Sequence, residues 1–175
     1  MERVRFECLE TRTEASMPDG TIKDYNLNFQ LRSEDKYSVL LFYPKDFTFV
    51  CPTELQGFSD LTERFTELGA QVFGISQDTA EVHNAWRIAD KRIGAVKFPL
   101  LADHRHLLSH FFNVYNEKLG VPERGLFVIK DSHIIFKLVS SIDVGRDPQV
   151  VIDFIEAHKT GKRTPCMWKP GEDFV

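Results

Sequence analysis

The three cysteines of this 175-residue chain, Cys8, Cys51 and Cys166, carry the side chains most able to act as nucleophiles or redox centres. They form no Cys-x-x-Cys pair and no zinc-ligand spacing, and they are too few for a disulfide-stabilised scaffold. In a reducing compartment they are expected to be thiols whose reactivity depends on their surroundings. Cys8 has no recognisable partner and is interpreted as a non-catalytic thiol.

The surroundings of Cys51 favour a reactive thiol. A loop that follows a predicted strand enters a predicted helix at Cys51, and the N–H groups and positive dipole end of a helix stabilise a thiolate. Thr48 can place a hydroxyl beside the sulfur, and Pro44 can shield the site from water without presenting an N–H group. A lone cysteine at such a position is more often a small buried apolar residue, so the position of Cys51 does not by itself establish an activity.

The predicted elements around Cys51 form a βαβ unit. Residues 36–43 are rich in apolar and aromatic side chains and predict a buried strand, and residues 71–76 predict a second one. Between them, apolar residues recur every three or four positions up to Gly69, which predicts one helix. Two strands joined by a crossover helix are expected to lie parallel in one sheet.

Further strands and helices alternate along the rest of the chain. A possible Asp78/Glu81 capping box begins a helix whose apolar stripe includes Trp86, and Asp131-Ser132 predicts a hairpin turn. A helix that begins at Asp147-Pro148 is expected to bury one side and to end at Gly161. That buried side comprises Val150, Val151, Phe154, Ile155 and His158. The element order predicts an α/β fold of the thioredoxin-like type, with a central mixed sheet flanked by helices. Residues 1–160 are expected to form this domain, and residues 161–175 a mobile C-terminal tail.

The segment around Cys51 resembles the peroxiredoxin family. The peroxide-reacting cysteine of that family lies in a Pro-x-x-x-Thr-x-x-Cys motif, which Pro44, Thr48 and Cys51 match. The longer run Phe-Thr-Phe-Val-Cys-Pro-Thr-Glu is similar to the typical two-cysteine group that includes the alkyl hydroperoxide reductases of the AhpC type. The resemblance implies that Cys51 is oxidised by hydroperoxides to a sulfenic acid.

The same resemblance implies roles for three charged residues. Arg124 in Arg-Gly-Leu-Phe-Val-Ile matches the arginine that closes the active site of the family, where a fixed cation stabilises the thiolate and the charge that develops on the peroxide. Arg146 in Val-Gly-Arg matches a second arginine, which joins Glu54 in a polar network around the first. Glu54 also occupies the position of the second cysteine of a thioredoxin motif, so a local dithiol cycle at Cys51 is excluded.

Cys166 is the candidate resolving cysteine, and the resemblance implies that it forms a disulfide with Cys51 of the other protomer of a homodimer. Five such dimers form a ring, a decamer, in relatives. Cys166 lies two residues before Trp168, a spacing closer to relatives that are reduced by an AhpD-type protein than to the more common Cys-Pro-Ala-x-Trp pattern. AhpD-type protein, thioredoxin and a flavoprotein reductase all remain possible electron donors. Cys166 as a tail thiol without a role is the alternative.

Composition excludes several other functions. Lys and Arg number 22 against 26 Asp and Glu, so the chain lacks the positive field that nucleic-acid binding requires. The longest apolar run, residues 39–43, is far too short for a membrane span, and the N-terminal residues do not resemble a secretory signal, which predicts a cytoplasmic protein. His104, His106 and His110 are interpreted as solvated side chains, and neither a metal nor another cofactor is expected.

The sequence therefore predicts a thiol-dependent peroxidase that reduces hydrogen peroxide and alkyl hydroperoxides in antioxidant defence. A redox-regulated chaperone or a peroxide-signalling protein is the alternative from another class, because ring-forming relatives can bind unfolded clients. A thiol-disulfide oxidoreductase acting on proteins is a third hypothesis, which Glu54 disfavours.

Overall fold

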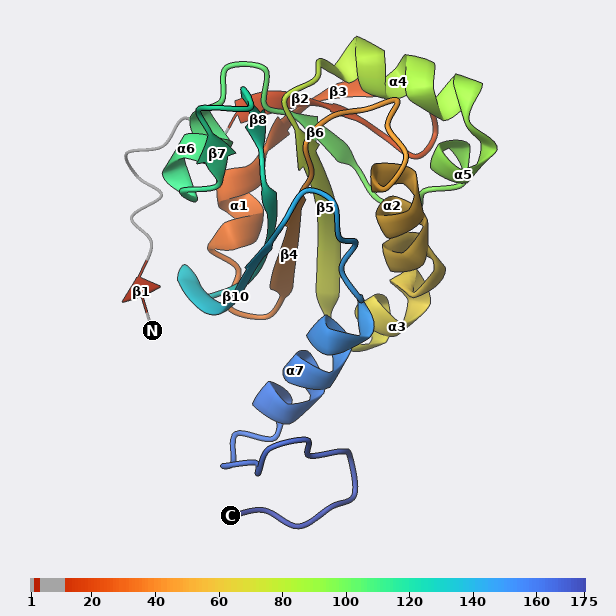
Figure 1. Ribbon diagram of the computed structural model, residues 1–175. Helices are drawn as coiled ribbons and strands as arrows, with labels where there is room; N and C mark the ends of the chain where they lie inside the picture. Colours follow the sequence, from red (N-terminus) through yellow and green to blue (C-terminus); the bar gives the residue numbers. More distant parts are fainter. Residues whose placement is uncertain (1, 4–11) are drawn as a thin grey trace.

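One eight-stranded sheet organises the chain, and the computed structural model describes residues 2–3 and 12–175 (Figure 1). The strand order is β1-β10-β9-β4-β5-β6-β2-β3. These strands are β1 (Glu2–Arg3), β2 (Arg12–Ser16), β3 (Ile22–Asn26), β4 (Tyr37–Phe42), β5 (Ala70–Ser76), β6 (Leu100–Ala102), β9 (Arg124–Lys130) and β10 (His133–Ser140). A separate antiparallel pair consists of β7 (Tyr115–Asn116) and β8 (Val121–Pro122). Cys8 lies outside the described residues.

The sheet is mixed, as predicted. Strands β4, β5 and β6 run parallel, whereas β9 is antiparallel to β4, and β10 is antiparallel to β9. The hairpin of β2 and β3 extends the sheet through antiparallel pairing of β2 with β6, and no pattern in the first 35 residues predicted it. Asp131 and Ser132 have φ angles of 47° and 59° in the turn between β9 and β10, which confirms the predicted hairpin.

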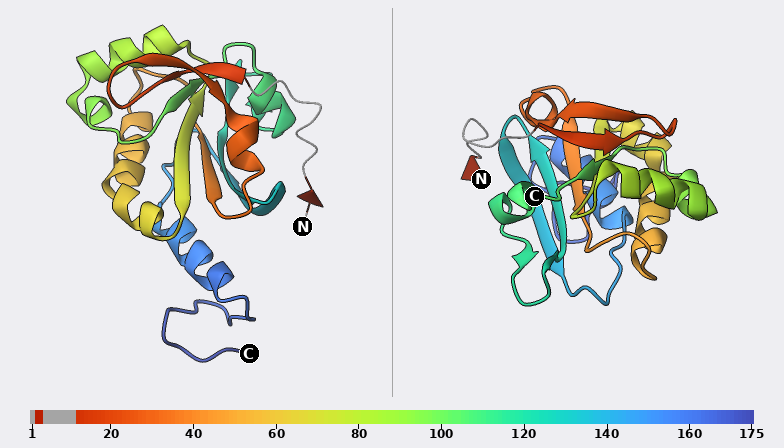
Figure 2. Two further views of the ribbon diagram at one scale, coloured as in Figure 1. Left: turned by 180° about the vertical axis from the view of Figure 1, so that it is seen from behind. Right: turned by 90° about the horizontal axis from the view of Figure 1, so that it is seen from above.

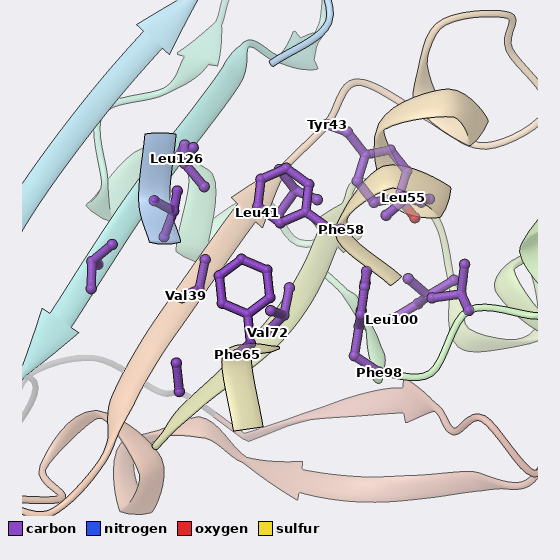
Figure 3. Packing of buried hydrophobic residues seen from close by; sticks show 14 of the residues in the cluster. Val39, Leu41, Tyr43, Leu55, Phe58, Phe65, Val72, Phe98, Leu100 and Leu126 are labelled. Carbon is purple, nitrogen blue, oxygen red and sulfur yellow. The ribbon is translucent and has the colours of Figure 1, made fainter. Parts of the chain in front are cut away.

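Helices cover both faces of the sheet, so that β4 is buried along its whole length. Alternate residues of β4 enter different hydrophobic clusters because successive side chains of a strand point to opposite faces. Val39 and Leu41 pack with the helices of one face (Figure 3), and Leu40 and Phe42 with those of the other. The first face is covered by α2 (Cys51–Asp60), α3 (Thr62–Glu67), α4 (Ala80–Ala89), α5 (Lys91–Gly94) and α7 (Gln149–Lys159), and the second by α1 (Leu27–Leu31) and α6 (Leu107–Phe111).

Three details of the helices differ from the prediction. The helix expected from Cys51 to Gly69 is interrupted at Leu61, which ends α2 and begins α3; the apolar periodicity continues across this single residue and so does not reveal the break. Thr79, not Asp78, caps α4, because the carboxylate of Asp78 accepts hydrogen bonds from another loop and from the end of β5. In α7, Val150 is 42% exposed and Ile152 lies in the core instead.

The strand register explains how distant segments meet at one end of the sheet. Leu41 of β4 pairs with Leu126 of β9, so the first residues of β9 extend past the C-terminal end of β4. The chain leaves β4 at the same end and enters α2. The beginning of β9 and the N-terminus of α2 are thereby brought together from positions more than 70 residues apart.

Candidate active site

Cys51 is the first residue of α2 and is reached from β4 through residues 43–50, here called the Cys51 loop. Its side chain is buried, with 1% of the residue exposed. Pro52 lies in the first turn of α2, where its missing N–H group costs no helical hydrogen bond. The positive end of the α2 dipole is therefore directed at the sulfur, an arrangement that favours a thiolate over a thiol.

Arg124 reaches Cys51 from the first position of β9. Its Nη1 atom lies 3.5 Å from Sγ of Cys51 and donates to Oε2 of Glu54 at 2.5 Å. Its Nε atom donates to the carbonyl oxygen of Ile142 at 2.7 Å. These contacts fix the guanidinium in one orientation against the sulfur. Substrate oxygen atoms that approach the sulfur would meet the same cation.

Glu54 holds both predicted arginines. Besides the hydrogen bond from Arg124, its carboxylate accepts three hydrogen bonds from Arg146. The three donors of Arg146 are its backbone N at 2.8 Å, Nε at 2.7 Å and Nη2 at 3.0 Å. Arg146 also donates from Nη1 to the carbonyl oxygen of Gly125 at 2.7 Å. Burial lowers the pKa of Arg146 from its ordinary value, and the ion pair with Glu54 opposes that shift.

A negative charge on the sulfur of Cys51 would balance the charges of this buried group. Two guanidinium groups share one carboxylate, so the three side chains together carry one positive charge. All three side chains are almost completely buried. An unbalanced charge is costly in the protein interior. A negative sulfur next to Arg124 neutralises the group, and the network therefore favours the reactive form of the cysteine.

A pocket of about 320 Å³ opens over the sulfur. Pro44, Thr48, Cys51 and Arg124 all line it, so the structure brings the three residues predicted to surround the reacting sulfur together with Cys51. The hydroxyl of Thr48 donates to the carbonyl oxygen of Lys45 at 3.1 Å. The other lining residues are Lys45, Phe49, Val50, Leu119, Val121 and Ile142.

Half of these other lining residues come from segments with no recognisable pattern. Leu119 lies between β7 and β8, Val121 is the first residue of β8, and Ile142 follows β10. Their sequence neighbourhoods suggest surface turns, and only the folded topology shows that they face Cys51. They give the entrance of the pocket a mainly apolar wall.

Cys166 is not part of this pocket. It is exposed and unpaired on the segment that follows α7, and Figure 1 and Figure 2 show this segment at the end of the molecule away from the N-terminus of α2. The segment packs back on α7: Trp168 is 8% exposed, and Lys169 contacts Asp153 of α7 at 2.5 Å. Within one chain, the two cysteines are therefore far from bonding distance in this conformation.

Two of the three histidines that were interpreted as solvated side chains contact an aromatic ring. His106 and His110 each place their ring centroid 4.6 Å from that of Tyr115. Across residues 2–3 and 12–175, no cluster of three or more His, Cys, Asp or Glu side chains could hold a metal ion. None of the helices that the structure describes combines the length and apolar composition needed to cross a bilayer.

Comparison with known proteins identifies the family of this chain. The model of the AhpC/TSA family matches residues 10–137, well over half of the chain. The chain belongs to the AhpC/TSA family. A peroxiredoxin of Cynops pyrrhogaster is 36% identical over 174 residues, which cover 95% of this chain and 86% of the relative.

Solved structures agree in fold as well. Reduced 2-Cys peroxiredoxin of Plasmodium vivax is similar with a TM-score of 0.85 and 29% identity, covering 93% of this chain and 87% of that one. AhpC of Enterococcus faecalis has a TM-score of 0.84 and 28% identity over 94% and 99% of the two chains. The protein is a thioredoxin-like 2-Cys peroxiredoxin of the AhpC type and a thiol-dependent peroxidase, as predicted. The chaperone alternative is not favoured.

Replacement of Arg124 by lysine tests the fixed guanidinium of this peroxiredoxin. Lysine keeps the charge but cannot donate to Glu54, Ile142 and the sulfur from one rigid plane. We expect Arg124→Lys to lower the second-order rate constant for hydrogen peroxide about 100-fold, as loss of one aligned donor does elsewhere. Stopped-flow kinetics measures this rate. Arg64→Lys, at a half-exposed arginine that also binds carboxylates, is the matched control, and an equal effect of both substitutions would contradict the assignment.

Proposed function

We propose that Cys51 is the cysteine that reacts with peroxide. The observation that carries this proposal is the position of its sulfur, at the N-terminus of α2 and 3.5 Å from the fixed guanidinium of Arg124. The thiolate attacks the terminal oxygen of ROOH, the one that carries the hydrogen, so that an S–O bond forms and the O–O bond breaks. The sulfur is oxidised to a sulfenic acid, and the leaving alkoxide takes up a proton and departs as ROH.

The neighbours of Cys51 have separate roles in this step. The Thr48 hydroxyl donates its own hydrogen to Lys45, so its oxygen is oriented to accept the hydrogen of the peroxide. Arg124 stabilises the negative charge that develops on the breaking O–O bond, and Pro44 keeps water from the sulfur. Glu54 and Arg146 hold Arg124 in place without touching the substrate. Hydrogen peroxide and alkyl hydroperoxides are the proposed substrates, and the apolar pocket wall accommodates the alkyl group.

Cys166 is proposed as the resolving cysteine. Its sulfur attacks the sulfenic sulfur of Cys51, an S–S bond forms, and the hydroxyl group leaves as water. The separation of the two cysteines within one chain favours a disulfide between the protomers of a homodimer. Trp168 and Lys169 must leave α7 for Cys166 to move far, so we propose that residues 161–175 are mobile during the cycle. Assembly of five dimers into a decamer is part of the same proposal.

A separate protein dithiol completes the cycle by reducing the disulfide and becoming oxidised itself. The Cys166-Met-Trp168 spacing favours an AhpD-type protein over thioredoxin or a flavoprotein reductase as this donor. The enzyme needs no metal or organic cofactor of its own for these steps. Such a cycle fits a reducing compartment, and we propose a cytoplasmic location and a role in antioxidant defence.

Oxidation by one equivalent of hydrogen peroxide tests the two-cysteine cycle. We expect wild type to form a disulfide-linked dimer, whereas Cys166→Ser stops as a monomer that has gained one oxygen atom. Intact-mass measurement and non-reducing electrophoresis distinguish these products, with Cys51→Ser as the unreactive control. Wild type that stays reduced, or that crosslinks through Cys8, would contradict the cycle.

A further inference from the structure

A buried polar network lies behind the Cys51 loop and connects it to α4. His83 and Trp86 are three residues apart on α4 and therefore face the same side of that helix. Tyr43, Asp46 and Phe47 of the Cys51 loop contact this side. His83 and Tyr43 are both 0% exposed, so neither can contact a substrate in the pocket. None of these residues belongs to the catalytic motif.

Asp46 is the centre of the network. Its Oδ1 atom accepts a hydrogen bond from the hydroxyl of Tyr43 at 2.9 Å, and its Oδ2 atom lies 2.7 Å from Nδ1 of His83. Burial raises the pKa of Tyr43 well above its ordinary value, and the charge of Asp46 raises it further, so the hydroxyl keeps its hydrogen and donates it. Burial also raises the pKa of Asp46, and the bond to His83 opposes that shift.

The other ring nitrogen of His83 contacts a different element of the fold. Nε2 faces the carbonyl oxygen of Leu101 at 3.3 Å, and a carbonyl can only accept, so Nε2 carries a hydrogen. With Nδ1 at 2.7 Å from Oδ2 of Asp46, both ring nitrogens of His83 have a polar partner. His83 thus bridges the Cys51 loop and β6 through one ring nitrogen on each side. Such a fully bonded buried network is rigid.

The backbone of Asp46 is anchored separately. Its N–H group donates to Oδ2 of Asp78 at 2.8 Å, and the same oxygen accepts from the hydroxyl of Ser76 at 2.9 Å. Ser76 is the last residue of β5. Both the side chain and the backbone of Asp46 are consequently fixed to the rigid part of the fold.

The next residue, Phe47, has an uncommon backbone conformation. Its φ angle is 55°, in the left-handed region that costs a bulky residue energy and persists only where the surroundings enforce it. Asp46 is anchored on one side of Phe47, and the ring of Phe47 packs on Trp86 with a centroid distance of 5.9 Å. Thr48 follows directly, so its hydroxyl is aimed by this enforced turn.

We propose that His83 and Trp86 of α4 act as a clamp that positions Pro44 and Thr48 over Cys51, with His83 as a positioning residue for peroxide reduction. The clamp stabilises the strained turn at Phe47 through Asp46 and the aromatic contact. This inference rests on the proposed role of Cys51 and Thr48. It assigns an indirect role in the reaction to residues that never meet the substrate.

Two reactions of the same sulfur separate positioning from general reactivity. Peroxide must be oriented by Thr48, whereas a neutral alkylating reagent such as iodoacetamide needs only an accessible thiolate. We expect His83→Leu to lower the rate constant for hydrogen peroxide about 10- to 100-fold, the usual cost of a misplaced group. Alkylation of Cys51 should stay unchanged or become faster. His83→Gln, whose amide N–H group can still donate to Asp46, should recover most of the peroxide rate.

Further variants keep this test decisive. Phe73→Leu removes buried apolar volume on the opposite face of the sheet and controls for loss of stability alone. If His83→Leu does not fold, Tyr43→Phe removes a single donor to Asp46 and should lower the peroxide rate several-fold without slowing alkylation. Equal losses in both reactions, or no loss of the peroxide rate, would overturn the clamp. If wild-type Cys51 does not react with peroxide at all, the proposed function itself fails.

Discussion

Cys51→Ser is expected to reduce peroxide consumption to the uncatalysed level, a loss of about 10⁴-fold or more, as for other catalytic nucleophiles. The serine hydroxyl is nearly the same size as the thiol and fits the same buried position at the start of α2. It is not ionised near neutral pH, and it cannot form the S–O bond on which the reaction depends. The positive charge shared by Arg124, Arg146 and Glu54 then has no partner, but the fold is retained.

Peroxide consumption in the presence of excess dithiothreitol measures this loss, and circular dichroism confirms that the variant is folded. Cys166→Ser is the matched control because it removes the other described cysteine and leaves the first oxidation step intact. Activity of Cys51→Ser above one hundredth of wild type would show that another group reacts with peroxide, and the assignment of Cys51 would be wrong.

The sequence was most informative where function depends on neighbouring residues. Pro44 and Thr48 lie on the loop that leads directly to Cys51, so their spacing already brings the three residues close to one pocket. Arg124 and Arg146 are distant in the chain and were predicted only through family resemblance; the structure brings both to Glu54. The strands and the βαβ unit followed from apolar patterns because burial of β4 and β5 is nearly continuous.

The remaining features depend on contacts that periodicity does not reveal. Leu119 and Ile142 line the pocket from turns that follow β7 and β10, and no sequence pattern connects these turns with Cys51. Asp78 resembles a helix cap, but its bond to the backbone of Asp46 competes with that role and leaves Thr79 as the cap. The role of His83 was not predicted, because a single polar residue in an amphipathic helix does not reveal from the sequence which side chains it contacts.

Glu54→Gln should have the second largest effect, because it removes the negative charge shared by two buried guanidinium groups. The side chain of Glu54 is 0% exposed, and its two oxygens accept four hydrogen bonds from Arg124 and Arg146. Glutamine offers one accepting oxygen and places its NH₂ group against a donor. Breaking a buried ion pair in this way typically costs about 3–5 kcal/mol in the free energy of unfolding.

The substitution should also slow the reaction with peroxide. Without the carboxylate, the Nη1 atom of Arg124 loses its 2.5 Å anchor, and repulsion from Arg146 moves the guanidinium away from its position beside Sγ of Cys51. The displaced cation then stabilises both the thiolate and the developing charge on the peroxide less than it does in wild type. Denaturant unfolding and stopped-flow oxidation measure the two losses on the same preparation.

Glu67→Gln provides the matched control on the neighbouring helix α3. Glu67 is 64% exposed and pairs with Arg64, a surface interaction worth at most about 1 kcal/mol. If Glu54→Gln were no more destabilising than Glu67→Gln, the buried charges would have to be balanced in another way. A normal peroxide rate in Glu54→Gln would instead mean that Arg124 keeps its orientation through Ile142 alone, because that carbonyl is its remaining anchor. The expected combination of both losses would show that one carboxylate stabilises the fold and aligns the active-site cation.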